Sequence, residues 1–271
     1  MGRLYRLGCV PYINAYPIIK WFEALGPESP VELDLEVPSK LPELLEAGKV
    51  DAIMTSSYEA LTKPNKKFAD QISISCIGPV ASVKLFSNVP AQQIQTLALD
   101  QSSLTSNCLA QIILKESYGV RPRAEQRYPD INKMLRDFDG CVIIGDNCMN
   151  VQEKGLYEYD LGEEWYKLTR LPFVWALWIG SERLDPELVS LLIRAKRWGF
   201  ENLDDLVQTA DLKTGWGMDR CKKYFTEFIN YDFTNAHFEG LMKFREYMEK
   251  LSLIERSYIP ERIELSYTVS S

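Results

Sequence analysis

Apolar positions along this chain follow two periods in turn, one near two residues as in strands and one near 3.6 as in helices. The expected strands cover residues 4–10, 31–37, 51–55, 82–86, 96–100, 141–144 and 173–179. We expect a helix over 15–25 with Asn14 as its N-cap, a short helix capped by Ser39, and a helix that ends at Gly119. A further helix is capped by Asp185 and has Pro186 at its first position, and a long amphipathic helix runs through 241–251. Because strands and helices alternate, we expect an α/β fold with mixed, mostly parallel sheets and right-handed crossovers.

The length of the chain and the order of these elements predict two lobes. A chain of 271 residues is long enough to bury two cores. We expect residues 1–88 and 173–271 to form one lobe and residues 89–172 the other, with crossings near 88–90 and 170–172, where prolines adjoin strong strands. This is the two-lobe architecture of periplasmic-type binding proteins, in which the ligand lies in a cleft between lobes that close by hinge motion.

The strongest chemical signal is the polar segment 99–107, L-D-Q-S-S-L-T-S-N, between a strand and a helix. The first N–H groups of a helix have no partner within it, and the helix dipole adds partial positive charge there. Ser103, Thr105 and Ser106 can add neutral donors, so the segment is a candidate anion site. The alternative is ordinary N-capping by one of these hydroxyls.

Other small polar residues also fall at the ends of expected strands, where open α/β sheets bind ligands. They are Asn14 in segment 10–17, Ser56 and Ser57 in 55–59, Ser82 in 78–83, and Asp146 and Asn147 in 144–149. Each of them could serve local capping alone. Convergence of all of them on one cleft would instead indicate a binding site.

Composition excludes several classes of function. The net charge of −7 disfavours nucleic acid, because phosphate contacts need a basic surface, but an anionic small molecule can still bind at a locally positive site. The lone histidine, His237, falls on an apolar helical stripe, and the six cysteines form no C-x-x-C pair. We therefore expect no metal site and no histidine-dependent triad. No G-x-G-x-x-G or Walker sequence occurs, which disfavours nucleotide cofactors.

The sequence also bears on location. The N-terminal segment has no long apolar stretch with a small-residue cleavage site, and no run approaches the ~18 apolar residues of a membrane helix. Scattered cysteines in apolar runs are typical of buried free thiols. A reducing, cytoplasmic location and no membrane partner are the expectation, and a homodimer stays open.

Several motifs in one order resemble the chorismate dehydratase family of the futalosine route to menaquinone. They are V-P-Y-I-N-A-Y-P (10–17), G-P-V-A-S-V (78–83), L-D-Q-S-S-L-T-S-N (99–107), I-G-D-N-C-M (144–149) and D-L-G-E-E-W-Y-K-L-T-R-L-P-F-V-W-A-L-W (160–178), and the C-terminal pattern of Tyr231, His237, Gly240, Leu241 and Phe244 also fits. The resemblance runs over nearly the full length. Two departures are Arg170, where glycine is expected, and Thr55 in T-S-S-Y.

The resemblance implies a type 2 periplasmic-binding-protein fold that works as a cytoplasmic lyase without metal or cofactor. It implies conversion of chorismate, a small dicarboxylate, to 3-[(1-carboxyvinyl)oxy]benzoate and water. The sister family of 1,4-dihydroxy-6-naphthoate synthases carries a His-Glu pair about where this chain has Gly145 and Asp146, so the dehydratase is favoured. A non-catalytic binding protein for a small carboxylate is the alternative from another class.

Site roles follow as hypotheses. We expect Thr105 and Ser106, with Ser103, to hold one carboxylate, and Ser56 with Ser57 to hold another polar end of the substrate. Ser82 and Asn147 are further candidates for binding. Asn14 would orient the reacting carbons, because an amide is too weak a base to remove a carbon-bound proton. The substrate's own enolpyruvyl carboxylate is one candidate acceptor for that proton, and Asp146 is the other.

Overall fold

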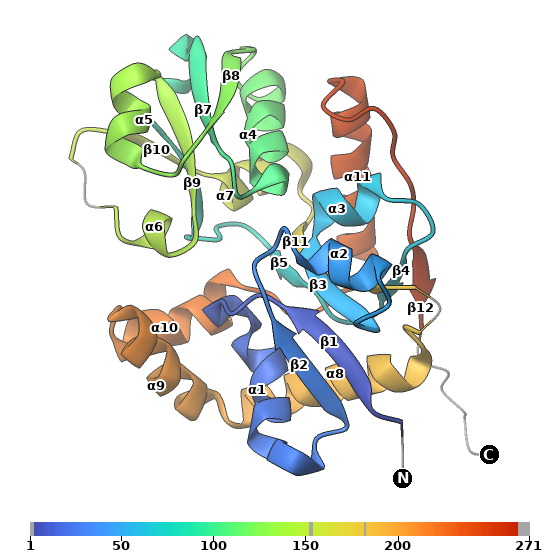
Figure 1. Cartoon of the computed structure of the whole chain (residues 1–271). Coiled ribbons are helices and arrows are strands. Elements are labelled where there is room, and N and C mark those ends of the chain that lie inside the picture. The colour runs from blue at the N-terminus through green and yellow to red at the C-terminus, as the bar shows by residue number, and fades with distance from the viewer. Residues whose placement is uncertain (1–2, 152–153, 182, 265–271) are drawn as a thin grey trace. The chain divides into compact units, whose positions relative to one another are not determined.

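The computed structural model describes residues 3–151, 154–181 and 183–264 (Figure 1). The chain divides into two compact units. The first contains Met1–Ser75, Val174–Thr234 and Ser257–Ser271, and the second contains Cys76–Phe173 and Asn235–Arg256. Each unit builds its own sheet and core, so each is described by itself.

This division differs from the expected one in two segments. Residues 76–88 belong to the second unit because β6 (Val83–Ser87) pairs antiparallel with strands of that unit. Residues 235–256 also belong there, because helix α11 (Asn235–Lys250) packs on α4 (Leu104–Glu116). The chain therefore passes between units at 75/76, 173/174, 234/235 and 256/257 rather than near 88–90 and 170–172. Both segments lie far in sequence from their partners, and a single sequence gives no signal for such pairings.

The first unit is built on a seven-stranded mixed sheet in the order β12-β4-β11-β3-β1-β2, with β5 paired to β11. Strands β1, β2 and β3 run parallel, and β11 runs antiparallel to β3 and β4. Its elements are β1 (Tyr5–Cys9), η1 (Ile13–Ala15), α1 (Tyr16–Leu25), η2 (Gly26–Glu28), β2 (Val31–Leu35), α2 (Leu41–Glu46), β3 (Ala52–Ser56), α3 (Ser57–Thr62), β4 (Lys67–Ala69), β5 (Ile74–Cys76), β11 (Phe173–Gly180), α8 (Pro186–Glu201), α9 (Leu203–Thr214), α10 (Met218–Lys223), the π-helical turn η4 (Tyr224–Phe228) and β12 (Glu261–Ile263).

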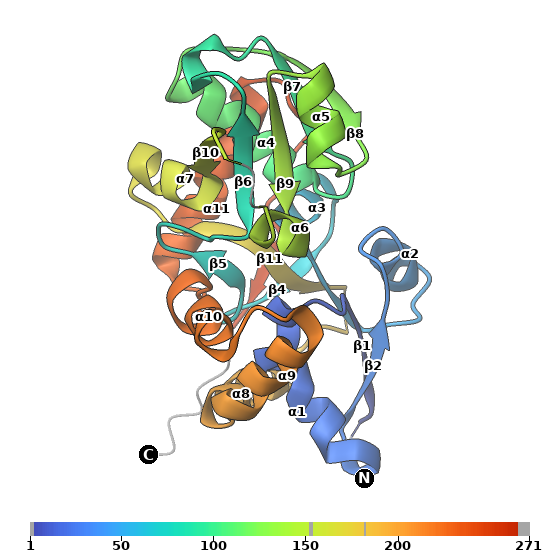
Figure 2. The same ribbon diagram turned by 90° about the vertical axis from the view of Figure 1, so that its left-hand side faces the viewer.

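Helices α1 and α8 lie side by side in this unit, and a glycine lets them approach closely (Figures 1 and 2). A Cβ atom on Gly199 of α8 would come within 2.1 Å of the carbonyl oxygen of Pro17 in α1. Any larger residue at Gly199 must therefore push α1 away. Because α1 begins two residues after Asn14, this contact also fixes the position of the loop that carries Asn14.

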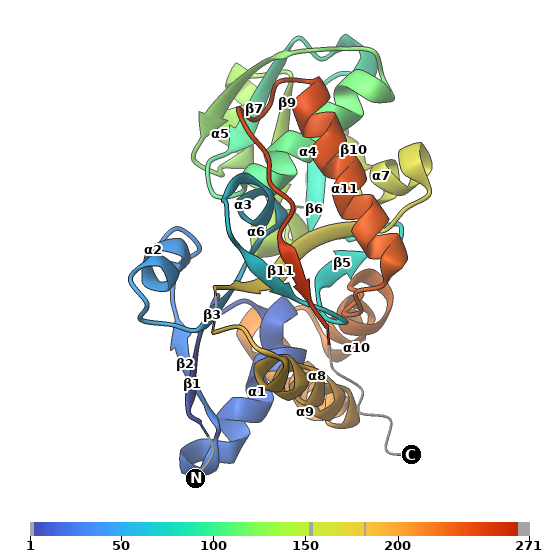
Figure 3. The same cartoon turned by 90° about the vertical axis from the view of Figure 1, so that its right-hand side faces the viewer.

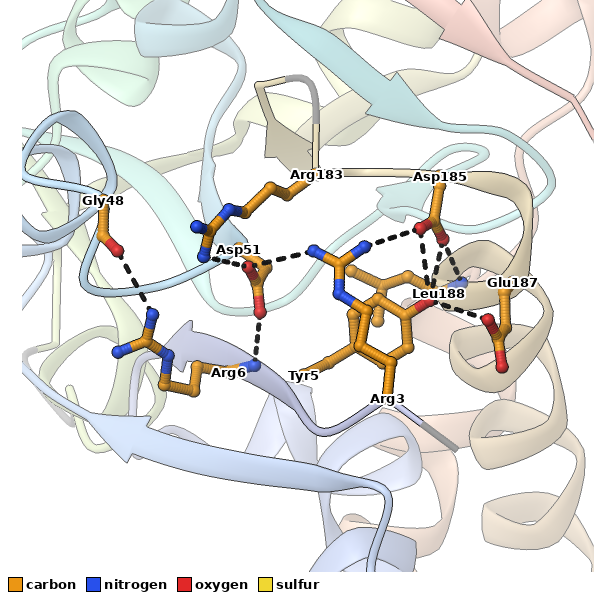
Figure 4. A network of polar contacts seen from close by, with 9 residues as sticks. All are labelled: Arg3, Tyr5, Arg6, Gly48, Asp51, Arg183, Asp185, Glu187 and Leu188. Atoms are coloured by element: carbon orange, nitrogen blue, oxygen red, sulfur yellow. Dashed lines mark hydrogen bonds and ion pairs between the residues drawn. The ribbon is translucent and has the colours of Figure 1, made fainter. Parts of the chain in front are cut away.

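Charged side chains fasten the amino-terminal ends of the parallel strands (Figure 4). The carboxylate of Asp51, only 2% exposed, accepts the backbone N–H of Arg6 at 2.8 Å and pairs with Arg183 at 3.2 Å and Arg3 at 3.5 Å. The Tyr5 hydroxyl lies 3.0 Å from carboxylate oxygens of Asp185 and Glu187. The network lies at the edge opposite the carboxyl ends of β1 and β3, so these charged side chains do not occupy the carboxyl edge.

The second unit has a five-stranded sheet in the order β10-β6-β9-β7-β8. Strand β7 runs parallel to β8 and β9, and β6 runs antiparallel to β9 and β10, so the sheet is mixed in equal parts rather than mostly parallel. Its elements are β6, η3 (Ala91–Gln93), β7 (Thr96–Asp100), α4, β8 (Arg123–Arg127), α5 (Ile131–Asp137), β9 (Gly140–Ile144), α6 (Gly145–Met149), β10 (Tyr157–Asp160), α7 (Leu161–Thr169) and α11.

Aromatic side chains tie α7 and α11 of this unit together. Trp165 packs edge-on against Phe173 and Phe244, and its indole N–H donates to the carbonyl oxygen of Pro172 at 3.1 Å. Gly240 lets α11 approach the same carbonyl, since a Cβ there would lie 2.1 Å from it. Figure 3 shows α11 beside α4, the helix with the polar N-terminus. These contacts make α4 part of a tightly packed helical layer.

The helix caps test the local predictions. Asp185 caps α8 as expected, accepting the N–H of Leu188 at 2.9 Å. The predictions for Asn14 and Ser39 are wrong: Asn14 lies inside η1 while Ala15 precedes α1, and Lys40 precedes α2 without a side-chain cap. The apolar spacing locates a helix well, but a one-residue or two-residue shift of its start moves the cap to another residue.

Candidate functional site

In the first unit, the sequence-predicted residues gather at the carboxyl edge of the parallel strands. Asn14 follows the carboxyl end of β1, and Ser56 and Ser57 stand at the carboxyl end of β3. Because β1 and β3 are parallel neighbours, these ends meet at one edge of the sheet. The topology therefore brings the three residues to the same side of this unit.

Asn14 offers an unused acceptor. It sits in the 3₁₀ turn η1, which is closed by the bond from the N–H of Ala15 to the carbonyl of Tyr12 at 3.0 Å. Its amide oxygen Oδ1 is buried and has no hydrogen-bond partner among the described residues. A buried amide oxygen without a partner is costly unless a ligand or water completes it. Asn14 thus has the character of a binding residue rather than that of a helix cap.

The two serines of the first unit differ in what they can offer. The Ser56 hydroxyl oxygen caps α3 by accepting the N–H of Glu59 at 3.3 Å, which leaves its proton for a ligand. Ser57 is fully buried and donates its proton to the carbonyl of Val174 at 2.5 Å. Ser57 therefore holds β11 against α3, and only Ser56 is placed to donate to a ligand.

In the second unit, the candidates also share one edge. Helix α4 begins after the carboxyl end of β7, and Gly145–Asn147 follow the carboxyl end of its parallel neighbour β9. Ser82 precedes β6, which is antiparallel to β9, so it reaches the same edge. The N–H of Gly145 donates to the carbonyl of Ser82 at 2.7 Å, so the loops bearing Ser82 and Asp146 are in direct contact.

The start of α4 is not capped in the ordinary way. Ser103 is its N-cap residue, but its side chain makes no capping hydrogen bond and instead donates to the Ser106 hydroxyl at 2.7 Å. The Ser106 oxygen is thereby supplied with a donor, and its own proton remains for an acceptor outside the helix. The Ser103 hydroxyl therefore does not cap the first-turn N–H groups of α4.

The turn before α4 is held by two further polar residues. The buried Asp100 accepts the N–H of Ser102 at 2.8 Å and its hydroxyl at 2.5 Å, and Asn107 donates to the carbonyl of Asp100 at 2.7 Å. Thr105, Ser106 and Asn107 are all at most 3% exposed. Buried polar residues and a helix N-terminus at one edge are the elements of an anion site built on a rigid frame.

Asp160 supports a loop of the candidate site, and the sequence reasoning did not single it out. Its carboxylate accepts the backbone N–H groups of Val80 and Ala81, at 3.0 and 2.7 Å, and caps α7 through Gly162 and Glu163. Burial raises the pKa of this carboxyl above its ordinary value, against the opposing effect of these backbone donors. Asp160 thus fixes the loop that presents Ser82. An Asp ahead of L-G-E-E is a helix-capping signal in the sequence. The N–H groups of Val80 and Ala81, its other donors, are about 80 residues away and give no local signal.

Asp146 and Asn147 belong to the short helix α6, whose ribbon is labelled in Figure 2. Both residues are exposed. Gly145 begins the helix with a positive φ of 62°, which a residue with a side chain rarely adopts. Within the described residues, the Asp146 carboxylate forms no ion pair or hydrogen bond. A free carboxylate at the edge that carries the α4 N-terminus is available for proton transfer.

The candidate residues described above offer mainly neutral donors, together with the free carboxylate of Asp146. The lone histidine, His237, is 3% exposed on α11, among the packing side chains that its apolar stripe predicts. The described residues contain no group of three or more His, Cys, Asp or Glu side chains close enough to hold a metal ion. All six cysteines are buried and free, as expected, and burial raises the pKa of the Cys9 thiol to about 12. No helix among the described residues is long and apolar enough to cross a membrane.

Comparison with known proteins gives the family. A family model described as menaquinone biosynthesis matches residues 5–250. The chain is 29% identical to a chorismate dehydratase of Thermus thermophilus, over 79% of this chain and 84% of that protein. It is 26% identical to a chorismate dehydratase of Campylobacter jejuni, over 91% of this chain and 98% of that protein.

Solved structures share the fold. A protein of Archaeoglobus fulgidus aligns with a TM-score of 0.70 at 17% identity, covering 92% of this chain and 98% of that one. The periplasmic aliphatic sulphonate binding protein SsuA of Escherichia coli aligns with a TM-score of 0.64 at 13% identity, covering 97% and 94%. At these identities the likeness concerns the fold alone, which is that of the periplasmic binding proteins, as expected.

Proposed function

The chain belongs to the menaquinone biosynthesis family, and from that premise we propose that it is a chorismate dehydratase, a hydro-lyase that converts chorismate to 3-[(1-carboxyvinyl)oxy]benzoate and water. The observation that carries the proposal is the uncapped N-terminus of α4, where Ser103 turns its hydroxyl toward Ser106. Such a site suits a carboxylate, and chorismate has two.

The reaction needs alignment more than a strong catalyst. The ring C3–H of chorismate is vinylogous to the ring carboxylate, so removing that proton spreads negative charge onto the carboxylate. The group that removes the C3 proton passes it to the C4 hydroxyl, which leaves as water, and the ring becomes aromatic. The protein must orient the departing groups, exclude water and stabilise the charge that develops on the carboxylate.

The start of α4 supplies the charge stabilisation. Ser106, with its hydroxyl oxygen already supplied by Ser103, donates its proton to the ring carboxylate, and Thr105 and the first-turn N–H groups add further donors. Fixed dipoles of this kind need no rearrangement as charge develops. The loop with Ser82, held by Asp160, adds a polar wall at the same edge.

The first unit supplies orientation. The buried, unpartnered Oδ1 of Asn14 accepts a hydrogen bond from the C4 hydroxyl and fixes the angle at which it leaves. The Ser56 proton is directed to the enolpyruvyl end. Ser57 serves only to support this edge of the first unit, because its hydroxyl donates to the carbonyl of Val174.

The first candidate acceptor for the C3 proton is the enolpyruvyl carboxylate of the substrate. Asn14 is an amide and does not act as a base, and the hydroxyls near α4 are donors to negative charge. Asp146, the free carboxylate at the edge of the second unit, is the second candidate acceptor. We further propose that the enzyme acts in the cytoplasm, without metal or cofactor; a homodimer is compatible with this proposal.

Incubation of the purified protein with chorismate, with and without EDTA, tests the proposal directly. We expect a product lighter than chorismate by one water, with an aromatic absorption spectrum, at the same rate in both samples. Binding without any product would favour a solute-binding function, as in the sulphonate-binding protein that shares the fold. Turnover of the cyclic futalosine-type substrate in place of chorismate would favour 1,4-dihydroxy-6-naphthoate synthase.

A further inference from the structure

An open cavity of about 480 Å³ lies in the first unit, apart from the candidate residues at its strand edge. It is formed by the second half of α8, the turn η4 and the segment that follows: Lys196, Arg197, Phe200, Phe225, Thr226, Ile229, Asn230, Tyr231 and Asp232. We propose that this cavity is a second small-molecule site, which binds a planar aromatic monocarboxylate. The inference does not depend on the reaction proposed above.

The charged side chains that line the cavity favour a ligand with a single negative charge. Lys196 pairs with Asp232 at 2.8 Å and also donates to the carbonyl of Gln71 at 2.9 Å, so these two side chains neutralise each other. Asp232 is the one carboxylate of the lining. Arg197 has no ion pair or hydrogen bond among the described residues. The cavity therefore presents one uncompensated guanidinium in a chain of net charge −7, and this group can bind a carboxylate with two parallel hydrogen bonds.

The apolar side chains that line the cavity favour a ligand with a flat ring. Phe200 lines the cavity and is 39% exposed, so part of its ring is open to a ligand. Its ring packs edge-on against Tyr231, with centroids 5.4 Å apart and an interplanar angle of 73°. Phe225 and Ile229 close the interior at 0% and 5% exposed. A flat ring can stack on the open face of Phe200 while its carboxylate reaches Arg197.

Tyr231 supports this wall of the cavity. Its side chain is 3% exposed, and its ring packs against the ring of Phe200. The Tyr231 hydroxyl is buried and gives no contact for a ligand in the open space, so recognition of the ligand depends on Arg197 and Phe200.

Titration with benzoate, followed by ligand-observed NMR, tests the site. We expect saturable binding. Arg197→Met should weaken the affinity about tenfold or more, because a charged bidentate contact is lost, and Phe200→Ala should weaken it as well. Arg194→Met is the matched control, since Arg194 lies on the same helix but stacks over Trp21 at 5.2 Å, outside the cavity. It should leave the affinity unchanged. Acetate, which lacks the ring, and benzyl alcohol, which lacks the charge, should both fail to compete.

Benzoate also resembles the proposed reaction product, so the two sites must be told apart. Ser106→Ala alters the proposed substrate site, and benzoate binding should survive it with unchanged affinity. The inference is overturned by the absence of saturable benzoate binding, by an unchanged affinity in Arg197→Met, or by loss of binding in Ser106→Ala. None of these results bears on whether chorismate is dehydrated.

Discussion

At the scale of single residues, the hydrogen-bond direction between two serines decides what the start of α4 can bind. The Ser103 hydroxyl donates its proton to the Ser106 oxygen, so the Ser106 hydroxyl proton is available for another acceptor. Because Ser106 is 2% exposed and lies in the first turn of α4, its hydroxyl is already oriented before any ligand binds. Preorganised donors of this kind are the ones that stabilise developing charge.

We predict that Ser106→Ala impairs chorismate binding and turnover together. The variant loses one donor to the ring carboxylate and leaves Ser103 without its acceptor. The expected loss in kcat/KM is about 10- to 100-fold, as for one charge-assisted hydrogen bond. Steady-state kinetics measure it. Ser102→Ala is the control: Ser102 bonds Asp100 in the preceding turn and should change kcat/KM much less. Equal losses in both variants would point to a general disturbance of the turn.

Asn14→Ala should lower turnover much more than affinity. The amide oxygen, which has no partner within the described protein, acts on the departing hydroxyl during the reaction rather than on a carboxylate. We expect kcat to fall about 10²-fold with KM changed little. Asn132→Ala, on the exposed face of α5, controls for the loss of an amide. Near-normal turnover in Asn14→Ala would remove Asn14 from the mechanism.

Arg170→Gly should stabilise the protein. Arg170 ends α7 with φ 61° and ψ 17°, the left-handed conformation in which glycine is favoured. Its guanidinium lies 5.8 Å from the Tyr166 ring, a weak and exposed contact. Glycine should raise the free energy of unfolding by about 1 kcal/mol, as denaturant titration measures. Arg170→Ala removes the same charge without relieving the backbone, and a gain in that variant as well would contradict the explanation.

At the scale of elements, the loop with Asn14 is held from another helix. Lys213, in the last turn of α9, donates to the carbonyl of Pro11, and its ammonium lies 5.4 Å from the ring of Tyr16. These two contacts fall on either side of Asn14 in the sequence. Helix α9 itself ends at Gly215, which has φ 68°, and Gly217 donates its N–H to Asp211 at 2.8 Å. The lysine therefore acts as a positioning residue for Asn14.

We predict that Lys213→Met lowers kcat about tenfold with little change in KM, because a misplaced orienting group affects the transition state most. Lys213→Arg, which retains a donor and a cation, should recover most of the activity. Lys222→Met is the control, since it breaks the exposed ion pair with Asp204 at 3.2 Å in the neighbouring helix. If Lys213→Met behaves like the control, the loop holds its place without this contact.

The sequence predicted the elements far better than their partners. The strand at Thr96–Asp100, the helix after it and the Asp185 cap follow from local spacing and capping chemistry, and the structure confirms them. The role of Asp160 and the antiparallel placement of β6 rest on pairs about 60 to 80 residues apart. No local pattern encodes such pairs. For the candidate site, the strand ends predicted which residues share one edge of each sheet. Only the structure shows that Ser57 bonds the Val174 carbonyl whereas Ser56 keeps its hydroxyl proton free.

At the scale of the whole molecule, each unit presents polar residues at one edge of its sheet. The second unit offers donors for a carboxylate at α4, whereas the first unit offers Asn14 and Ser56. The proposed enzyme uses residues of both units, so removing a polar group from either sheet should weaken the binding of a dicarboxylate.

The reaction product, 3-[(1-carboxyvinyl)oxy]benzoate, should make these contributions measurable, because it retains both carboxylates and is not turned over. At a hundredfold excess over Kd it should raise the melting temperature by about 5 °C, from ligand binding to the folded state alone. Ser106→Ala in the second unit and Asn14→Ala in the first should each reduce this shift, although the two residues belong to different sheets. If Ser106→Ala abolishes the shift while Asn14→Ala and Ser56→Ala leave it intact, then the product is held by the second unit alone. A binding role for the first unit would then have to be abandoned, while dehydration of chorismate could still be assayed on its own.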